Sequence, residues 1–443
     1  MNQNIKDRLQ QECRDQSIAF VKLQFTDIMG ATKNVTIPVE QLPKALDGDI
    51  AFDGGSIEGF VRIQESDMLL KPDPETFVVF PWLTNGMKTA RLMCDITWPD
   101  GTPFDGCPRT ILKRVLGRAE EMGYVPNAGP EPEFFLFKRD QDGRPTIEGH
   151  DHAGYFDLPP LDRGEAARED MVRKLSDMGF EVEAAHHEVA PAQHEIDFKY
   201  ADAVTTADRI ATFRFVVRTV ALQHNLHATF MPKPKFGIPG SGMHVHLSLF
   251  DSEGNAFFDE NAEDSLSDTC YSFLAGVMRN CREFTAITNP LVNSYKRLVP
   301  GFEAPVYIAW SRGNRSPLIR VPARRGVGTR LEVRSPDPAC NPYLALAVII
   351  SAGLDGIDEA LKPSEPVDDN IYEMGLEERR ERGIDSLPGT LAEALSEMRE
   401  SDLVRRVLGD HIVDRFLAAK QIEWDDYRTK VHQWELDRYL GAY

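Results

Sequence analysis

The sequence lacks the features of several broad classes of protein. No apolar run among its 443 residues approaches the length of about 18 that spans a membrane, and residues 1–8 contain no apolar leader segment. No two cysteines form a CxxC pair, which argues against a zinc site or a disulfide framework. The six are scattered: Cys13, Cys94, Cys107, Cys270, Cys281 and Cys340. We therefore expect a cytoplasmic protein with reduced thiols and no membrane partner.

Two common nucleotide-binding signatures are also missing. The chain contains neither GxxxxGK[ST] nor GxGxxG, so a Walker loop and a Rossmann fold are not supported. The formal net charge of −20 argues against nucleic acid as a partner. Local clusters of basic residues can still bind anions.

The length and the pattern of apolar residues predict a small domain followed by a larger one. Strands are expected at residues 19–25, 31–37, 78–80 and 90–96, where apolar residues alternate with polar ones or cluster in short runs. A segment rich in proline and glycine follows at residues 99–108, and we place the linker there. The prediction is a mixed β domain over residues 1–103 and a second domain over 104–443.

Residues 128–137, AGPEPEFFLF, hold the first candidate site. We expect a strand entered from a Gly-Pro turn, on which Glu131 and Glu133 point to the same face. Two carboxylates this close repel each other, and a divalent cation would offset the repulsion. The alternative at this point is a solvated end of a strand.

Two further segments supply possible ligands. Pro191 excludes a helix across residues 186–197, so Glu188 and Glu195 are expected on two strand segments joined by a bend. The glycine-rich residues 236–242 lead into a strand on which His244, His246 and Ser248 share a face.

Residues 296–334 concentrate positive charge in an acidic chain. They hold nine Lys or Arg residues against only Glu303 and Glu332. Arginine binds carboxylate and phosphate well because its planar group donates two hydrogen bonds at once. This segment predicts an anion site, with a basic protein–protein surface as the alternative.

Together these residues indicate a chemistry. Several carboxylates with one histidine suit Mg²⁺ or Mn²⁺ better than zinc, and their number predicts at least two ions per site. Metal ions beside arginines stabilise the transferring phosphoryl group in many enzymes. The residues alone predict a metal-dependent enzyme that uses a nucleoside triphosphate without a P-loop, and they leave its acceptor open.

The order of the motifs resembles the type I glutamine synthetases, and among them the α subgroup of Gram-positive bacteria. The similarity runs along the whole chain and is carried by DGGSIEGF (53–60), GPEPEF (129–134), HHEVAP (186–191), GSGMH (240–244), NSYKR (293–297), NRS (314–316) and RSPDP (334–338). It implies ATP-dependent ligation of L-glutamate and ammonia to L-glutamine through γ-glutamyl phosphate, a central step of nitrogen assimilation.

The resemblance also implies a fold and an assembly. The fold class is α+β, with an N-terminal β-grasp domain and a larger catalytic domain that has a curved antiparallel sheet, helices and a C-terminal helical tail. The assembly is a dodecamer of two hexameric rings with active sites between subunits, in which the tail reaches into the facing ring. Partners in nitrogen regulation occur in the α subgroup.

The roles of individual residues follow from the matching motifs. One metal is expected at Glu133, Glu188 and Glu195, and a second, which also touches the ATP phosphates, at Glu131, His244 and Glu332. Glutamate and the transferring phosphate are expected at Gly240, Arg297, Glu303, Arg315 and Arg334. The ATP site matches Glu183, Phe198, His246, Ser248, Arg315 and Arg320. The ammonium pocket matches Asp53 and Ser56 from a neighbouring subunit together with Tyr155 and Glu303, with Glu303 on a closing flap. Arg62 matches a residue linked to feedback inhibition by glutamine.

Two departures from the family pattern and two rival functions accompany these expectations. Pro239 replaces an Asn that helps to hold glutamate, and Gly55 replaces a Ser of the ammonium loop. Tyr372 lacks the sequence context of adenylylated relatives, so no adenylylation is expected there. The first rival function is ligation of glutamate to a polyamine or another amine, and the ammonium-pocket residues argue against it. The second is a non-enzymatic nitrogen regulator, which the complete set of metal ligands argues against.

Overall fold

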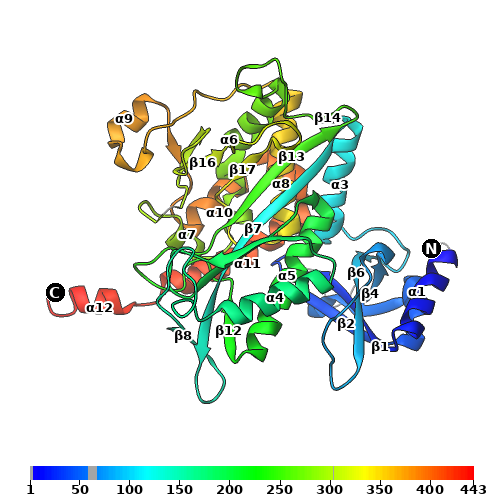
Figure 1. Ribbon diagram of the computed structural model, residues 1–443. Coiled ribbons are helices and arrows are strands. Elements are labelled where there is room, and N and C mark those ends of the chain that lie inside the picture. The colour runs from blue at the N-terminus through cyan, green and yellow to red at the C-terminus, as the bar shows by residue number, and fades with distance from the viewer. Residues whose placement is uncertain (1–2, 58–66, 303) are drawn as a thin grey trace.

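The first of two large sheets is formed by the N-terminal residues (Figure 1, blue). The computed structural model describes residues 3–57, 67–302 and 304–443. The strand order is β2-β1-β6-β4-β3, with β5 also paired to β6. The pair β1–β6 is parallel and the other pairs are antiparallel. The strands are β1 (Ile18–Thr26), β2 (Thr32–Pro38), β3 (Ile50–Asp53), β4 (Asp67–Pro72), β5 (Val78–Val79) and β6 (Lys88–Thr97).

Alternating apolar residues explain this sheet. Val21, Leu23 and Phe25 on β1 point inward and are buried against α1 (Gln3–Asp15) and α2 (Leu42–Leu46). The strands predicted at residues 19–25, 31–37, 78–80 and 90–96 are confirmed, with small differences at their ends.

The second sheet belongs to the larger part of the chain and has β7 at its centre (Figure 1). Its main strand order is β18-β15-β16-β17-β13-β7-β10-β9, while β8, β11 and β12 also pair with β7, and β14 pairs with β13. It is antiparallel except for the parallel pair β15–β16. The strands are β7 (Val125–Arg139), β8 (Pro145–Gly149), β9 (Val182–His187), β10 (Gln193–Phe198), β11 (Ala201–Asp202), β12 (Leu226–Thr229), β13 (Met243–Asp251), β14 (Gly254–Asn255), β15 (Tyr307–Ser311), β16 (Pro317–Arg320), β17 (Leu331–Val333) and β18 (Asp385–Ser386).

One local prediction is wrong. We expected a Gly-Pro turn before the strand of Glu131, but β7 already begins at Val125 and runs through Gly129 and Pro130. Proline cannot donate to the ladder. The strand is nevertheless held here, because Pro130 and Pro132 lie opposite Val245 and Met243 of β13, within a register that pairs eight residues.

Helices pack around this sheet and form the main core. The most apolar is α8, nearly all of which is buried, and it packs closely on α6. Gly276 and Gly356 allow this approach, since a Cβ at either position would lie only 2.2 or 2.1 Å from a backbone oxygen. The helices of this part are α3 (Pro108–Glu121), α4 (Glu165–Asp177), α5 (Ala203–Gln223), α6 (Asp268–Thr288), α7 (Ser294–Arg297), α8 (Pro342–Asp358), α9 (Leu376–Glu381), α10 (Leu391–Glu400), α11 (Asp402–Arg428) and α12 (Gln433–Tyr439).

A buried arginine connects the two parts. The guanidinium of Arg109 lies 2.7 Å from Asp73, 2.9 Å from Asp95 and 2.9 Å from Asp208, so it bridges the N-terminal sheet and α5. The α+β architecture is confirmed, and the domain boundary after residue 103 stays a prediction. Within the described residues, no helix is both long enough and apolar enough to cross a membrane.

Candidate active site

The carboxylates predicted as metal ligands converge on the central strands of the large sheet. Glu131 and Glu133 lie on β7, and their cross-strand neighbours are His244 on β13 and Glu195 on β10. On the next strand outward, Glu332 of β17 lies opposite His246. Antiparallel register thus gathers side chains from positions 131 to 332 of the chain on adjacent strands.

The first group consists of Glu133, Glu188 and Glu195, and the structure adds His186. The two ring nitrogens of His186 lie 3.4 Å from Glu188 Oε1 and 3.5 Å from Glu195 Oε1. Ligand atoms of His186, Glu188 and Glu195 lie within 4.8 Å of one another, a spacing that could hold a metal ion.

The electrostatics of this group favour a cation. Burial and the charge of Glu188 raise the pKa of Glu133 to about 8. Burial and the charges of Glu133, Glu131 and Glu188 raise the pKa of Glu195 well above its ordinary value. Carboxylates that resist ionisation because they repel one another gain most from a divalent ion.

The second group surrounds Glu131 and Glu332. His246 Nε2 lies 2.7 Å from Glu131 Oε1, and His244 Nδ1 lies 3.4 Å from Glu131 Oε2 and 3.6 Å from Glu332 Oε1. Glu332 also accepts hydrogen bonds from Arg320 and, at 2.6 Å, from Arg334. Burial opposes ionisation of Glu131, but hydrogen bonds with His244 and His246 hold its pKa well below the usual range. His244 is therefore in place to share a cation with the two carboxylates, whereas His246 donates from Nε2 to Glu131 because its Nδ1 accepts from Arg330.

Two hollows open beside these groups. The first is lined by Glu133, Pro239, Gly240, Arg297 and Arg334, which includes three of the residues predicted to hold glutamate. The second is lined by Glu183, Phe198, His246 and Ser248, four of the residues predicted to hold ATP. Arg320 does not line the second hollow and is paired with Glu332 instead.

Arg315 and Tyr155 lie at the edge of the first group. Arg315 lines a third hollow together with Arg312, Asn314 and Tyr372. Burial and the charge of Glu188 raise the pKa of Tyr155, whose hydroxyl is hydrogen-bonded to Arg315. The two residues are thus close to each other and to the carboxylates.

The remaining predicted residues lie elsewhere or outside the described residues. Asp53 is the last residue of β3 in the N-terminal sheet, where its carboxylate accepts hydrogen bonds from Gly55 N (2.9 Å) and Ser56 Oγ (2.6 Å). Neither Asp53 nor Ser56 lines any of the three hollows within the described chain. Arg62 and Glu303 lie outside the described residues.

Sequence reasoning missed several residues of the site. His186 lies on β9, two positions before Glu188; we expected Glu188 on the strand segment as well, but β9 ends at His187 and Glu188 begins the bend that follows. Gln193 is buried, and its side-chain amide donates to Glu133 Oε2 at 2.7 Å and to the Gly240 carbonyl at 3.1 Å. Arg324 and Arg330 line the second hollow, and Arg330 Nε donates to His246 Nδ1 at 3.1 Å. Only the basic composition of residues 296–334 indicated Arg324, whereas the strand pattern had also placed Arg330 on one face with Glu332 and Arg334.

The fold and the site define a class of metal-dependent enzyme with a carboxylate-rich sheet and an arginine-lined hollow. Family comparison agrees: the glutamine synthetase catalytic domain matches residues 105–439, and the glutamine synthetase β-grasp domain matches residues 17–99. The chain belongs to the glutamine synthetase family. The family, the β-grasp-containing fold and the ligase activity predicted from the sequence are thereby confirmed.

Individual relatives span nearly the whole chain. A glutamine synthetase of Staphylococcus aureus is 60% identical over 99% of this chain and 98% of its own length. One of Staphylococcus epidermidis is 59% identical over the same shares. A solved structure of GmaS in complex with ADP is 33% identical, with a TM-score of 0.89 over 98% of this chain and 99% of its own. A cryo-EM structure of Plasmodium falciparum glutamine synthetase is 26% identical, with a TM-score of 0.86 over 98% of both chains.

Proposed function

We propose that this chain ligates L-glutamate and ammonia at the site on β7, with ATP bound in the hollow of Phe198 and Ser248. The observation that carries the proposal is the convergence of Glu131, Glu133, Glu195 and Glu332, which lie on the three strands β7, β10 and β17 around β13. Enzymes of this family use ATP and divalent metal. Mg²⁺ or Mn²⁺ is the proposed ion, because the donors are mainly carboxylate oxygens.

The two groups of carboxylates suit two metal positions. Glu133, Glu188 and Glu195 would hold one ion, with His186 within reach, and Glu131, Glu332 and His244 would hold the other. When bound, the ions neutralise the charge on the phosphates and on the glutamate side chain. The chain itself holds these ligands in place through the register of its strands.

The arginines supply the remaining positive charge. Arg297 and Arg334 are both buried in the first hollow, and Arg297 donates to the backbone carbonyls of Ser335 (2.7 Å) and Arg334 (3.1 Å), which fixes its direction. A γ-carboxylate placed beside them attacks the γ-phosphorus of ATP, ADP leaves, and γ-glutamyl phosphate forms. Donors fixed in advance stabilise charge that develops in this step without reorganising.

Ammonia then attacks the acyl phosphate and phosphate leaves. Ammonium must first lose a proton, and Asp53 is the proposed base, with Ser56, Tyr155 and Glu303 completing the pocket. Since Asp53 and Ser56 line none of the hollows of their own chain, we propose that they act in a neighbouring subunit. Homologues in the family form oligomers, and a dodecamer of two hexameric rings is the proposed assembly.

The regulatory expectations remain proposals. Feedback inhibition by glutamine through Arg62 is proposed from the motif alone. Absence of adenylylation at Tyr372 has structural support, since the hydroxyl donates to the Ala304 carbonyl at 2.7 Å. Mass spectrometry of protein from nitrogen-rich cells tests this absence, and an AMP-modified Tyr372 would refute it.

Association with nitrogen-regulatory proteins is proposed from the resemblance to the α subgroup. A cytoplasmic location is also proposed, and it is supported by six free, buried cysteines.

One assay tests the function directly. Phosphate release from ATP is measured with glutamate and ammonium present together and with each omitted, using Mg²⁺ and then Mn²⁺. Release that requires both substrates and yields glutamine is expected. Putrescine replaces ammonium in a parallel reaction, and faster turnover with putrescine would favour the rival amine ligase.

A further inference from the structure

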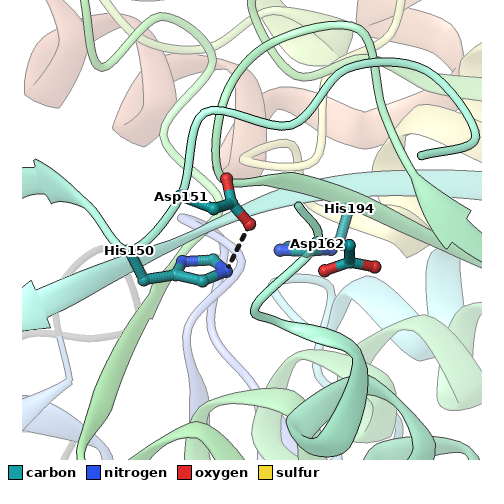
Figure 2. Close-up of side chains that lie close together, drawn as sticks. All are labelled: His150, Asp151, Asp162 and His194. Carbon is teal, nitrogen blue, oxygen red and sulfur yellow. Dashed lines mark ion pairs between the residues drawn. The ribbon is translucent and has the colours of Figure 1, made fainter. Parts of the chain in front are cut away.

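A second cluster of buried histidines and aspartates lies behind the first carboxylate group. Figure 2 shows His150, Asp151, Asp162 and His194, whose side chains face a common space and whose ligand atoms lie within 4.8 Å of one another. All four are buried. This spacing of buried donor atoms is also the one expected of a third metal site.

Arg168 argues against a metal there. Its Nη1 donates to His194 Nδ1 at 3.0 Å and lies 2.8 Å from Asp162 Oδ2. A neutral histidine that accepts at Nδ1 carries its proton on Nε2, so His194 has no lone pair directed into the space. The guanidinium also supplies the positive charge that Asp162 requires. The four residues and Arg168 therefore form a charge network that needs no metal ion.

Asp151 is the centre of this network, and its contacts lead to the carboxylate site. Its Oδ1 accepts from Ala192 N at 2.9 Å and lies 3.3 Å from His187 Nε2. Its Oδ2 accepts from Arg163 N at 3.3 Å and lies 2.9 Å from His150 Nε2 (Figure 2). His187 in turn contacts the Glu188 carbonyl through Nδ1 at 2.7 Å.

The segment held in this way is the bend between β9 and β10, residues 188–192. Ala192 has a φ of 64° there, a left-handed conformation that is unfavourable for a residue with a Cβ. Both of its peptide groups are anchored, the N–H by Asp151 and the carbonyl by Leu136 N at 2.9 Å. The same bend carries Glu188 and leads directly into Gln193 and Glu195.

The loop that carries Tyr155 is tied to the same network. Phe156 N donates to the His187 carbonyl at 3.1 Å, and the rings of Tyr155 and Phe156 stack with centroids 4.0 Å apart. One buried carboxylate thus connects the β9–β10 bend with the Tyr155 loop.

We propose that Asp151 is a positioning residue for the metal site of Glu133, Glu188 and Glu195, because it holds Ala192 of the bend at residues 188–192 in its left-handed conformation. This inference rests on the proposed function, since it assumes that these carboxylates bind a divalent cation. Groups that orient metal ligands from behind typically change metal affinity by about 10–100-fold when altered.

The test measures Mn²⁺ binding to the full-length protein by calorimetry. The Mn²⁺ dependence of activity is measured in parallel. Asp151→Asn keeps the size of the side chain and removes its charge. We expect the apparent Kd for Mn²⁺ to rise about 10–100-fold, while kcat at saturating Mn²⁺ stays close to that of the unaltered enzyme. Asp208→Asn is the matched control, because Asp208 is an equally buried carboxylate that accepts from Arg109 (2.9 Å) and Tyr343 (2.7 Å) in a different network. It should lower the Tm without changing the Kd for Mn²⁺.

Two further variants address the mechanism. Adding Ala192→Gly to Asp151→Asn should restore part of the Mn²⁺ affinity, because glycine adopts a positive φ without penalty. Should Asp151→Asn fail to fold, His187→Asn replaces it: the amide can still reach the Glu188 carbonyl but loses the contact with Asp151, and a raised Kd for Mn²⁺ is expected.

The outcomes separate the two proposals. Unchanged Mn²⁺ affinity in Asp151→Asn and His187→Asn would overturn the positioning role while leaving the proposed function intact. Mn²⁺ binding that survives Glu133→Gln unchanged would instead contradict the metal site itself. Specific binding of Zn²⁺ that is lost in His150→Gln would show that the cluster is a metal site and would also overturn the inference.

Discussion

Glu195 on β10 lies directly opposite Glu133 on β7, in an antiparallel pair that brings a buried and a half-buried carboxylate face to face. Cross-strand neighbours of like charge destabilise a sheet. Here the arrangement is retained in the centre of the largest sheet, at the wall of the arginine-lined hollow. The protein thus stores electrostatic repulsion at the place where a cation is needed.

Neutralising one carboxylate of this pair should lower activity without lowering the stability of the metal-free protein. In Glu133→Gln we expect the metal-free protein to keep its Tm or gain slightly, because a repulsive carboxylate has been removed. Activity should fall at least about 10²-fold, because a metal ligand is lost. Thermal unfolding in EDTA and the glutamine-forming assay measure the two effects. Glu181→Gln, which alters an exposed ion pair with Lys199, is the control and should change neither. A large loss of Tm without metal in Glu133→Gln would contradict the prediction.

The same repulsion predicts an unusual pH dependence for the metal-free protein. Glu133 has a pKa of about 8 and Asp197 one of about 9 in the folded state, against ordinary values of 4.5 and 3.8. At a pH between the ordinary and the raised pKa of each group, the folded protein binds more protons than the unfolded chain. The free energy of unfolding should therefore decrease as the pH rises. The slope is at most about 1.4 kcal/mol per pH unit for each group.

Urea titrations at pH 6 and pH 8 in EDTA check this slope. Glu131 and Glu332, whose pKa values are lowered, are ionised in both states throughout this window and do not alter the sign. Burial lowers the pKa of His194 and of His244, and these two groups oppose the decrease near pH 6. Saturating Mn²⁺ should abolish or reverse the decrease, because the ion binds the ionised carboxylates. Stability in EDTA that increases from pH 6 to pH 8 would argue against the raised pKa values.

Removing Arg109 should destabilise the junction between the two parts of the chain. Arg109→Ala leaves Asp73, Asp95 and Asp208 without their shared cation, and breaking a buried ion network of this kind costs about 3–5 kcal/mol. Urea unfolding measures the loss, and Mn²⁺ affinity should be unaffected. Arg8→Ala, which alters an exposed pair with Glu75, serves as control and should cost less than about 1 kcal/mol. Equal losses in the two variants would refute the prediction.

Restoring the family's asparagine at Pro239 should improve glutamate binding. Pro239 lines the hollow of Arg297 and Arg334 but has no side-chain donor. One additional hydrogen bond of about 1 kcal/mol corresponds to a KM for glutamate roughly 5-fold lower in Pro239→Asn. Initial rates at varied glutamate, with ammonium and ATP saturating, measure it. The KM for ATP is the internal control, and an unchanged KM for glutamate would show that the backbone already compensates.

The local sequence pattern was sufficient to predict the placement of many residues of the site. The same-face placement of Glu131 and Glu133, and of His244 and His246, follows from strand alternation and is seen in the structure. Pairing across strands could not be obtained in this way, because it depends on long-range register. The contacts of Gln193 with Glu133 and Gly240 are one example, and those of Asp151 with the β9–β10 bend are another. The turn expected at Gly129 failed for a related reason: packing of β7 against β13 overrides the local tendency of Gly-Pro to break a strand.

The central position of β7 has a consequence for biogenesis. Glu131 faces one metal group and Glu133 the other, on a strand paired with both β13 and β10. A slip of a single residue in either pairing would turn the carboxylates to the opposite side of the sheet. Misaligned chains could then retain no ion at either position, so retention of metal would report whether newly made chains have folded with the native alignment.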